Sequence, residues 1–242
     1  MILLFNISIC EETIMYRLVI FDLDDTLIDF SKYEEYAINF MFERLKIDYK
    51  DFDYLLFSKI DKELWSKKIF ENINVKISDI PIKRFEIFFN KLKISNVSIT
   101  LANELFMEGL IDAVFEIPES NQILNYLKSK NYIICIATNG IIKLQKTRAL
   151  KTSFSKYIDQ IVVSEEIGEN KPSPKIFLKI LKDNNVSHKE TIMIGDSLKN
   201  DILGAKNIGI TSVWYNPLNK LNQTNILPDF QILNLLELKN IL

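Results

Sequence analysis

The chain is poor in the residue types on which many binding sites depend. Its 242 residues include one histidine and two cysteines. The single His188 excludes metal sites built from several histidines, and its polar surroundings argue against a catalytic role. Cys10 and Cys135 lie far apart, and Cys135 falls within an apolar run, so we expect a small buried side chain there. The formal net charge of -2 provides no basic field, and we expect no nucleic-acid partner.

The sequence also lacks an apolar run long enough to cross a bilayer. Residues 1–10 are apolar but too short, and Glu11 and Glu12 follow them directly. No basic segment or small-residue cleavage site accompanies this stretch. We interpret residues 1–14 as an N-terminal extension and Met15 as a candidate natural start. These features predict a cytoplasmic protein with no membrane partner.

The run from Leu18 to Phe21 is the first clear structural signal. Its four apolar residues are too few for a helix and predict a buried strand of a parallel sheet. Asp22, Asp24 and Asp25 follow it, and ligands of open α/β sheets bind beyond the carboxyl ends of strands. Neighbouring acids repel one another, and Mg²⁺ offsets such repulsion with all-oxygen ligation. The alternative is an acidic turn whose aspartates only cap backbone groups.

A long stretch with few glycines or prolines follows, and its apolar residues recur at helical spacing. Helices are predicted over about 33–45, 52–70, 82–92 and 99–110. Asp79 and Ser98 are typical of helix starts. Pro118 favours a boundary just after Ile117. We therefore predict a helical cap domain over 30–116, inserted into a core made of 15–29 and 117–242.

From Pro118 onward, strand-like and helix-like segments alternate. Further strands are predicted over 132–137, 160–163, 191–194 and 210–215. Helices are predicted over 120–130, 144–150, 171–184 and 202–207. The segment from Phe230 is predicted as a short strand or helix. Alternation of this kind is typical of βαβ units, so the predicted fold class is α/β, with a doubly wound, Rossmann-like parallel sheet.

Polar residues gather where these predicted strands end or in the turns that follow. They are Asp22, Asp24, Thr138, Asn139, Lys171, Asp196 and Asp201. Chemistry on a phosphate monoester needs such a set, because a metal and a lysine offset the repulsion between anions while fixed donors hold the phosphoryl oxygens. One carboxylate can attack phosphorus and form an aspartyl-phosphate. A second can protonate the leaving oxygen and later deprotonate water.

Four segments resemble the motifs of one known family, the haloacid dehalogenase superfamily of phosphohydrolases. In order, they are Phe21-Asp22-Leu23-Asp24-Asp25-Thr26-Leu27, Thr138-Asn139-Gly140, Lys171-Pro172-Ser173-Pro174 and Gly195-Asp196-Ser197-Leu198-Lys199-Asn200-Asp201. The resemblance covers the chain from about Leu18 to Tyr215. It implies a Rossmann-like core and an all-helical C1-type cap that closes over the site and selects the substrate.

The resemblance also implies catalytic roles. Asp22 would be the nucleophile and a Mg²⁺ ligand, and Asp24 would be the general acid/base and offer its backbone carbonyl to the metal. Lys171 would neutralise the nucleophile and the phosphate. The dehalogenases of the superfamily lack the aspartate at the position of Asp24, so its presence favours phosphoryl transfer over cleavage of a carbon–halogen bond.

The remaining motif residues receive binding roles from the same resemblance. Thr138 and Asn139 would hold the phosphoryl oxygens. Asp196 would ligate Mg²⁺, and Asp201 would support it directly or through water.

A narrower likeness points to the pyrimidine 5′-nucleotidase branch. It rests on Leu144-Gln145, on 163–168, on 197–204 and, in the cap, on Leu64-Trp65 and Arg84-Phe85. The glycine and tyrosine that follow the cap tryptophan in that branch are not recognisable in this chain. The branch implies a Mg²⁺-dependent nucleoside 5′-monophosphate phosphatase. Trp65 is the candidate for stacking on the base, although aromatic residues at helical spacing are also typical of core.

Other functions fit parts of the pattern. A phosphatase for sugar or small-acid phosphates, or a phosphomutase of the β-phosphoglucomutase type, would use the same core residues. A non-enzymatic module that binds a phosphate ligand is a further alternative. Asp25 and Asp29 are candidates for contact with the cap hinge or the metal shell, and helix capping or solvation explains them equally well. Lys175, on the helix after Lys171, is expected to be exposed.

Overall fold

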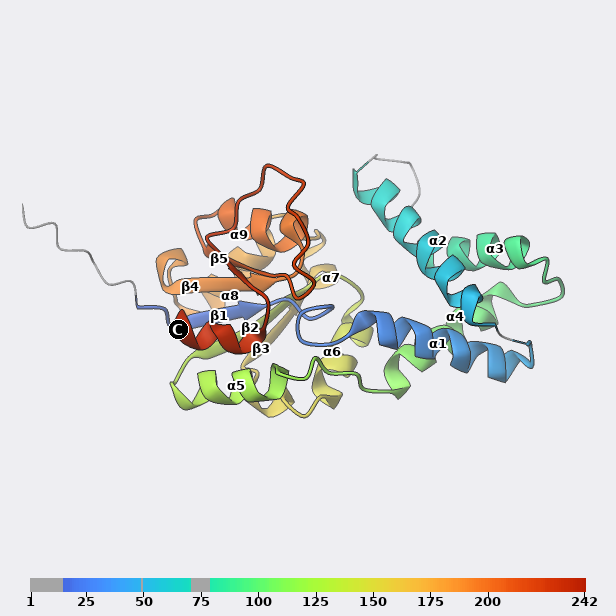
Figure 1. Cartoon of the computed structure of the whole chain (residues 1–242), viewed down its shortest axis with the longest axis horizontal. Coiled ribbons are helices and arrows are strands. Elements are labelled where there is room, and N and C mark those ends of the chain that lie inside the picture. Colours follow the sequence, from blue (N-terminus) through green and yellow to red (C-terminus); the bar gives the residue numbers. More distant parts are fainter. Residues whose placement is uncertain (1–14, 49, 71–78) are drawn as a thin grey trace, which may run out of the picture.

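The computed structural model describes residues 15–48, 50–70 and 79–242, and within helix α2 it describes the side chains of residues 53–64. The predicted extension over 1–14 lies outside the described residues. A six-stranded parallel sheet in the order β3-β2-β1-β4-β5-β6 forms the centre (Figure 1). The strands are β1 (Leu18–Phe21), β2 (Ile133–Thr138), β3 (Gln160–Val163), β4 (Thr191–Gly195), β5 (Thr211–Tyr215) and β6 (Phe230–Ile232). The predicted doubly wound α/β fold is confirmed.

The first strand lies in the middle of the sheet and is buried on both faces. In the register, Val19 is paired with Ile134 of β2 on one side and with Ile192 of β4 on the other. All four β1 side chains are fully buried, which explains the uninterrupted apolar run. Because neighbouring strands run parallel, their carboxyl ends meet at one edge of the sheet.

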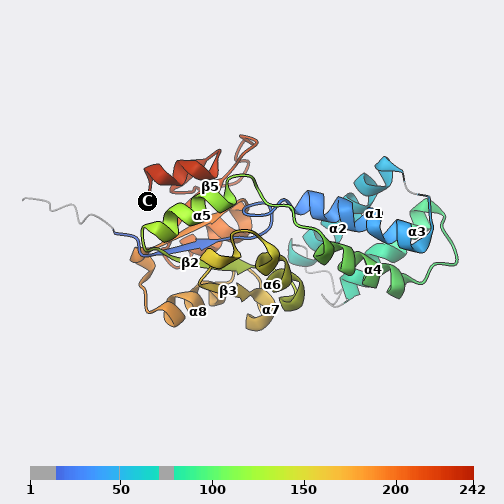
Figure 2. The same cartoon turned by 90° about the horizontal axis from the view of Figure 1, so that it is seen from below.

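Helices cover both faces of this sheet. The helices of the core, within the described residues, are α5 (Ser120–Ser129), α6 (Ile142–Lys151), α7 (Ser164–Ile167), α8 (Lys175–Asn184) and α9 (Leu203–Lys206), with short turns η2 (Ser155–Tyr157), η3 (His188–Glu190) and η5 (Leu235–Asn240). Val19 and Phe21 pack in one hydrophobic cluster with α5, whereas Leu18 and Ile20 pack in another with α8. Figure 2 shows α5 and α8 on opposite sides of the strands.

Four helices between β1 and α5 form the helical cap: α1 (Phe30–Leu45), α2 (Asp51–Phe70), α3 (Ile80–Leu92) and α4 (Ile99–Asp112). Helices α1 and α4 cross closely, because a Cβ on Gly109 would lie 2.8 Å from the Cα of Ala37. The inner faces of the cap carry an aromatic cluster in which the ring of Phe57 lies 5.1 Å from that of Phe106 and 5.2 Å from that of Phe85. The apolar periodicity over 30–116 thus belongs to helices that pack against one another, and their buried residues are continuous with those on one face of the sheet.

Two chain segments join the cap to the sheet, and they run side by side. The Asp29 N–H donates to the Phe115 carbonyl at 2.9 Å, and the Ile117 N–H donates to the Leu27 carbonyl at 3.0 Å. Asp29 also caps α1, since its carboxylate accepts from the Lys32 N–H at 3.1 Å. The predicted domain boundaries remain a prediction.

The helix predicted over 202–207 differs in detail. A π-helical turn, η4 (Leu198–Ile202), precedes the short α9. The carbonyl of Ser197 accepts from both the Asp201 and the Ile202 N–H, so the turn is wider than an α-helical one. The tail from Phe230 forms both β6 and η5. Within the described residues, no helix is long and apolar enough to span a membrane.

Candidate active site

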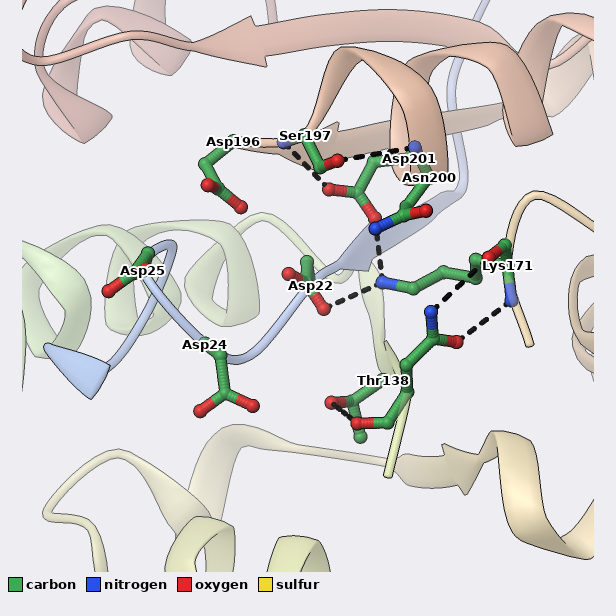
Figure 3. A pocket seen from close by; sticks show the side chains of 10 residues that line it. Asp22, Asp24, Asp25, Thr138, Lys171, Asp196, Ser197, Asn200 and Asp201 are labelled. Atoms are coloured by element: carbon green, nitrogen blue, oxygen red, sulfur yellow. Dashed lines mark hydrogen bonds and ion pairs between the residues drawn. The ribbon is translucent and has the colours of Figure 1, made fainter. Parts of the chain in front are cut away.

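Three neighbouring strands deliver polar residues to one cavity at the carboxyl edge of the sheet. Asp22 follows β1, Thr138 ends β2 and Asp196 follows β4. The cavity has a volume of about 270 Å³. It is lined by Asp22, Asp24, Asp25, Thr138, Asn139, Lys171, Asp196, Ser197, Asn200 and Asp201 (Figure 3). The core residues predicted from the sequence are therefore brought together.

Lys171 is the cation at the centre of the site and is 2% exposed. Its ammonium donates to Asp22 Oδ1 at 2.6 Å, to Asp201 Oδ1 at 2.6 Å and to the Ala137 carbonyl at 2.7 Å. Burial on its own would lower the pKa of Lys171, but the charges of Asp201 and Asp22 outweigh burial and raise it. The lysine is therefore cationic at neutral pH and holds one oxygen of Asp22 in place.

Three carboxylates share this single buried ammonium. One oxygen each from Asp22, Asp196 and Asp201 lies within 4.8 Å of the others. Burial raises the pKa of Asp22 to about 7 against the opposing charge of Lys171, and burial with the charges of Asp201 and Asp22 raises the pKa of Asp196 well above its usual value. Three acidic side chains thus face one ammonium, and an all-oxygen set of this kind fits Mg²⁺.

The backbone around Asp196 is fixed from two sides. Its N–H donates to Thr26 Oγ1 at 3.1 Å, and its carbonyl accepts from the indole N–H of Trp214 at 2.8 Å. Gly195 leaves the space that the Asp201 side chain occupies, since a Cβ there would collide with that carboxylate. Within the described part of the chain, no hydrogen bond reaches the Asp196 side-chain oxygens, so they are available to a cation.

Thr138 and Asn139 line the other side of the cavity. The amide of Asn139 is paired with the backbone of Lys171: its Oδ1 accepts from the Lys171 N–H at 2.8 Å, and its Nδ2 donates to the Lys171 carbonyl at 3.3 Å. Asn139 thus ties the end of β2 to the loop that carries the lysine. The predicted contact of both residues with phosphoryl oxygens stays a prediction.

Asp24 lines the cavity, but its carboxylate turns away from those of Asp22 and Asp196 (Figure 3). Two residues of α6 hold it. Gln145 Nε2 donates to Asp24 Oδ2 at 2.8 Å, Arg148 Nη2 donates to the same oxygen at 3.1 Å, and Arg148 Nη1 lies 2.8 Å from Oδ1. Sequence reasoning gave neither residue a role. The available signal was a glutamine and an arginine, three positions apart, on the buried face of a helix.

Several secondary predictions concern residues around the cavity. Asp25 lines the cavity and also caps the start of α1, because its carboxylate accepts from the Phe30 N–H at 3.1 Å. Lys175 is exposed and pairs with Glu169. The side chain of Trp65 lies outside the described residues, so its predicted contact with substrate stays a prediction.

Comparison with known proteins agrees with this geometry. A family model described as haloacid dehalogenase-like hydrolase matches residues 16–209. The chain belongs to the haloacid dehalogenase-like hydrolases. The resemblance of its four motifs is thereby confirmed at the level of the family, and the class of activity is hydrolysis.

Individual members of this hydrolase family give a finer picture. The pyrimidine 5′-nucleotidase YjjG of Escherichia coli is 29% identical over 225 residues, which cover 93% of this chain and 96% of that protein. A glyceraldehyde 3-phosphate phosphatase of Pyrococcus furiosus is 31% identical over 204 residues, which cover 82% of this chain and 80% of that protein. The magnesium-bound crystal structure of the HAD-hydrolase YfnB from Bacillus subtilis superimposes with a TM-score of 0.86 at 27% identity, covering 94% of this chain and 98% of that one.

Proposed function

We propose that this hydrolase is a Mg²⁺-dependent phosphomonoesterase that works through an aspartyl-phosphate on Asp22. The observation that carries the proposal is the setting of the Asp22 carboxylate. Lys171 fixes one of its oxygens at 2.6 Å, and the side chain faces a cavity edged by Asp196 and Thr138. A carboxylate nucleophile needs such an orientation toward phosphorus, together with positive charge to offset its repulsion from the substrate.

The metal would be held by Asp22, Asp196 and the backbone carbonyl of Asp24, with Asp201 supporting it. When bound, Mg²⁺ would neutralise the excess carboxylate charge and that of the phosphoryl oxygens. Asp201 is already engaged through both oxygens, with Lys171 at Oδ1 and the Ser197 N–H at Oδ2, 3.0 Å away. A supporting role for Asp201 suits this arrangement.

In the first step, an oxygen of Asp22 attacks phosphorus opposite the ester oxygen. The bond between phosphorus and the ester oxygen breaks, its electron pair goes to the leaving oxygen, and Asp24 supplies the proton that makes the alcohol. Lys171 keeps Asp22 oriented, and Thr138 lies where it can contact the phosphoryl oxygens.

In the second step, water attacks the phosphorus of the aspartyl-phosphate. Asp24, now ionised, accepts the proton of the water as the new bond between oxygen and phosphorus forms. The bond between phosphorus and the Asp22 oxygen breaks, which restores the carboxylate and releases inorganic phosphate. The same side chain therefore serves as acid and then as base.

We propose nucleoside 5′-monophosphates, with preference for pyrimidines, as the substrates, and the cytoplasm as the compartment. The support is the identity to YjjG along nearly the whole chain, together with the cap segments Leu64-Trp65 and Arg84-Phe85. A sugar phosphate or small-acid phosphate is the second candidate, favoured by the 31% identity to the glyceraldehyde 3-phosphate phosphatase.

The test is phosphate release with Mg²⁺ from a panel of nucleoside monophosphates, sugar phosphates and phosphoglycolate. Asp22→Asn serves as the blank. We expect turnover that EDTA abolishes, with UMP, dUMP or dTMP as the best substrates. If a sugar phosphate or acid phosphate is preferred, the proposed mechanism stands and the proposed substrate class is wrong. Release from no substrate, or equal release by Asp22→Asn, would contradict the proposal.

A further inference from the structure

The carboxylate of Asp24 is held by two side chains, although it lies at the edge of an open cavity. Arg148 and Gln145 reach it from the buried face of α6, and Arg148 spans both of its oxygens at 2.8 and 3.1 Å. Nη2 donates a hydrogen bond to Oδ2, whereas the contact between Nη1 and Oδ1 is an ion pair without a hydrogen bond. One hydrogen bond and one ion-pair contact from the same guanidinium limit how far the carboxylate can turn. Asp24 itself remains 27% exposed at the side chain, so one part of it still faces the cavity.

Arg148 is placed so that it has little freedom to move. Its side chain is 1% exposed, and the rings of Phe30 and Tyr33 on α1 lie 5.2 and 5.3 Å from its guanidinium carbon. Its Nε and Nη1 have no hydrogen-bond partner within the described residues. Asp24 is the carboxylate that compensates this buried charge, so separating the two would leave an unpaired cation out of water.

Gln145 connects the pair to the neighbouring motif. Besides Asp24, its Nε2 contacts Thr138 Oγ1 at 2.5 Å and the Asn139 carbonyl at 3.0 Å. Its Oε1 accepts from Arg148. Asp24 and the end of β2 are thus parts of one hydrogen-bonded network, and that network fixes the distance between them.

We propose that Arg148, assisted by Gln145, is the positioning residue for Asp24. Together they hold the carboxylate at the cavity edge, where it meets the leaving oxygen, and keep it turned away from Asp22 and Asp196. A carboxylate two residues from Asp22 and free to rotate would otherwise be drawn toward the divalent cation. The inference rests on the proposed function, because it needs Asp24 to act as acid and base.

The experiment measures kcat and KM with two substrates, UMP as a poor leaving group and p-nitrophenyl phosphate as a good one. Wild type, Asp24→Asn, Arg148→Met, Arg148→Lys and the double variant Asp24→Asn/Arg148→Met are compared with Mg²⁺ present. Lys146→Met is the control on the same helix, since Lys146 pairs with Glu166 at the surface. Melting temperatures establish that each variant is folded.

We expect Arg148→Met to lower kcat for UMP by about 10-fold or more, with a much smaller loss for the nitrophenyl ester and little change in KM. Arg148→Lys should recover part of the loss, because it restores a charge but not the paired contact. In the Asp24→Asn background, Arg148→Met should have no further effect on the ratio of the two rates, because both variants remove the same contribution. Lys146→Met should behave as wild type.

The inference fails if Arg148→Met lowers both rates equally, or if its effect is additive with that of Asp24→Asn. It also fails if Arg148→Met raises kcat, which would mean that the pair restrains Asp24. If Asp24→Asn leaves the ratio of rates unchanged, then the acid/base role fails and the proposed mechanism fails with it. Should Arg148→Met not fold, Gln145→Leu tests the same ratio, with a smaller change expected.

Discussion

Charged side chains are buried in two parts of this molecule, at the edge of the sheet and inside the cap. In the core, Lys171 lies between Asp22 and Asp201 at 2.6 Å from each. In the cap, Arg84 of α3 pairs with Asp61 of α2 at 3.0 Å, and both side chains are less than 10% exposed. Both regions therefore contain a cationic side chain that is buried together with a carboxylate.

The two parts differ in charge balance and in access. The site at the sheet edge has three carboxylates near one ammonium and opens into a cavity. In the cap, the rings of Phe57, Phe85 and Phe106 surround the guanidinium of Arg84, with Phe106 at 4.5 Å. The second acid nearby, Glu34, has its pKa raised to about 7 by burial and by the charge of Asp61. The carboxyl groups of both regions have raised pKa values, but those at the sheet edge face a cavity, whereas Glu34 is buried inside the cap.

Asp22→Asn, at the sheet edge, should have the largest effect of the variants, and that effect should be on turnover and not on stability. We expect turnover to fall by about three orders of magnitude or more, because an amide is a poor nucleophile. The fold should survive, and the melting temperature without Mg²⁺ should not fall, because burial already disfavours the charged form of Asp22. Phosphate release and thermal unfolding measure the two quantities. Turnover near that of wild type in a pure preparation would contradict the role of Asp22.

Asp61→Leu tests the cap pair. Removal of the carboxylate leaves Arg84 without its ion-pair partner, and breaking a buried pair costs about 3–5 kcal/mol in the free energy of unfolding. Urea denaturation measures that loss. The control is the double variant Asp61→Leu/Arg84→Met, which removes both charges and should regain most of the stability. A double variant as unstable as the sum of the single ones would mean that packing, and not charge, accounts for the loss.

Glu34→Gln tests the bound proton in the cap. The folded protein holds this proton up to a pKa of about 7, against a reference value of 4.5. The unfolded chain therefore loses its proton first, and the free energy of unfolding should fall as the pH rises from 4.5 to 7, by about 3 kcal/mol for this group. Glu34→Gln should remove that part of the slope. If the free energy of unfolding, measured in urea, changed with pH in the same way in the variant and in the wild type, Glu34 would not be the group that binds this proton.

Lys146→Met should have the smallest effect. The pair of Lys146 with Glu166 lies at the surface, with side chains 39% and 24% exposed. Solvent screens such pairs, so the free energy of unfolding should change by less than about 1 kcal/mol. Urea denaturation at low and high salt would measure it. If Lys146→Met lowered the free energy of unfolding as much as Asp61→Leu does, then burial would not explain the difference between the surface pair and the buried pair.

Sequence reasoning was strongest where chemistry follows directly on a strand. Asp22 and Asp196 come straight after apolar runs, and the edge of a parallel sheet brings such positions together without further information. Lys171 lies in a loop; it was included among the polar residues near the strand ends, and the resemblance to a family motif gave it its specific role.

Residues that meet across separate elements were harder to predict. Arg148 lies 124 positions from Asp24, and its contact depends on how α6, which packs against β3 and α4, lies relative to the loop after β1. In the same way, the pairing of Asp61 with Arg84 depends on the register of α2 against α3, which helical periodicity does not determine. Buried polar residues on an otherwise apolar helix face were the available sign in each case.

The most direct test of the central claim is to trap the intermediate. Asp24→Asn lacks the base for the second step, so rapid acid quenching after mixing with p-nitrophenyl phosphate radiolabelled at phosphorus, with Mg²⁺ present, should find label bound to the protein. The account predicts a hydroxylamine-sensitive acyl phosphate on the peptide that contains Asp22, and no label in Asp22→Asn. Continued release of nitrophenol without any protein-bound label, or label on another residue, would contradict it.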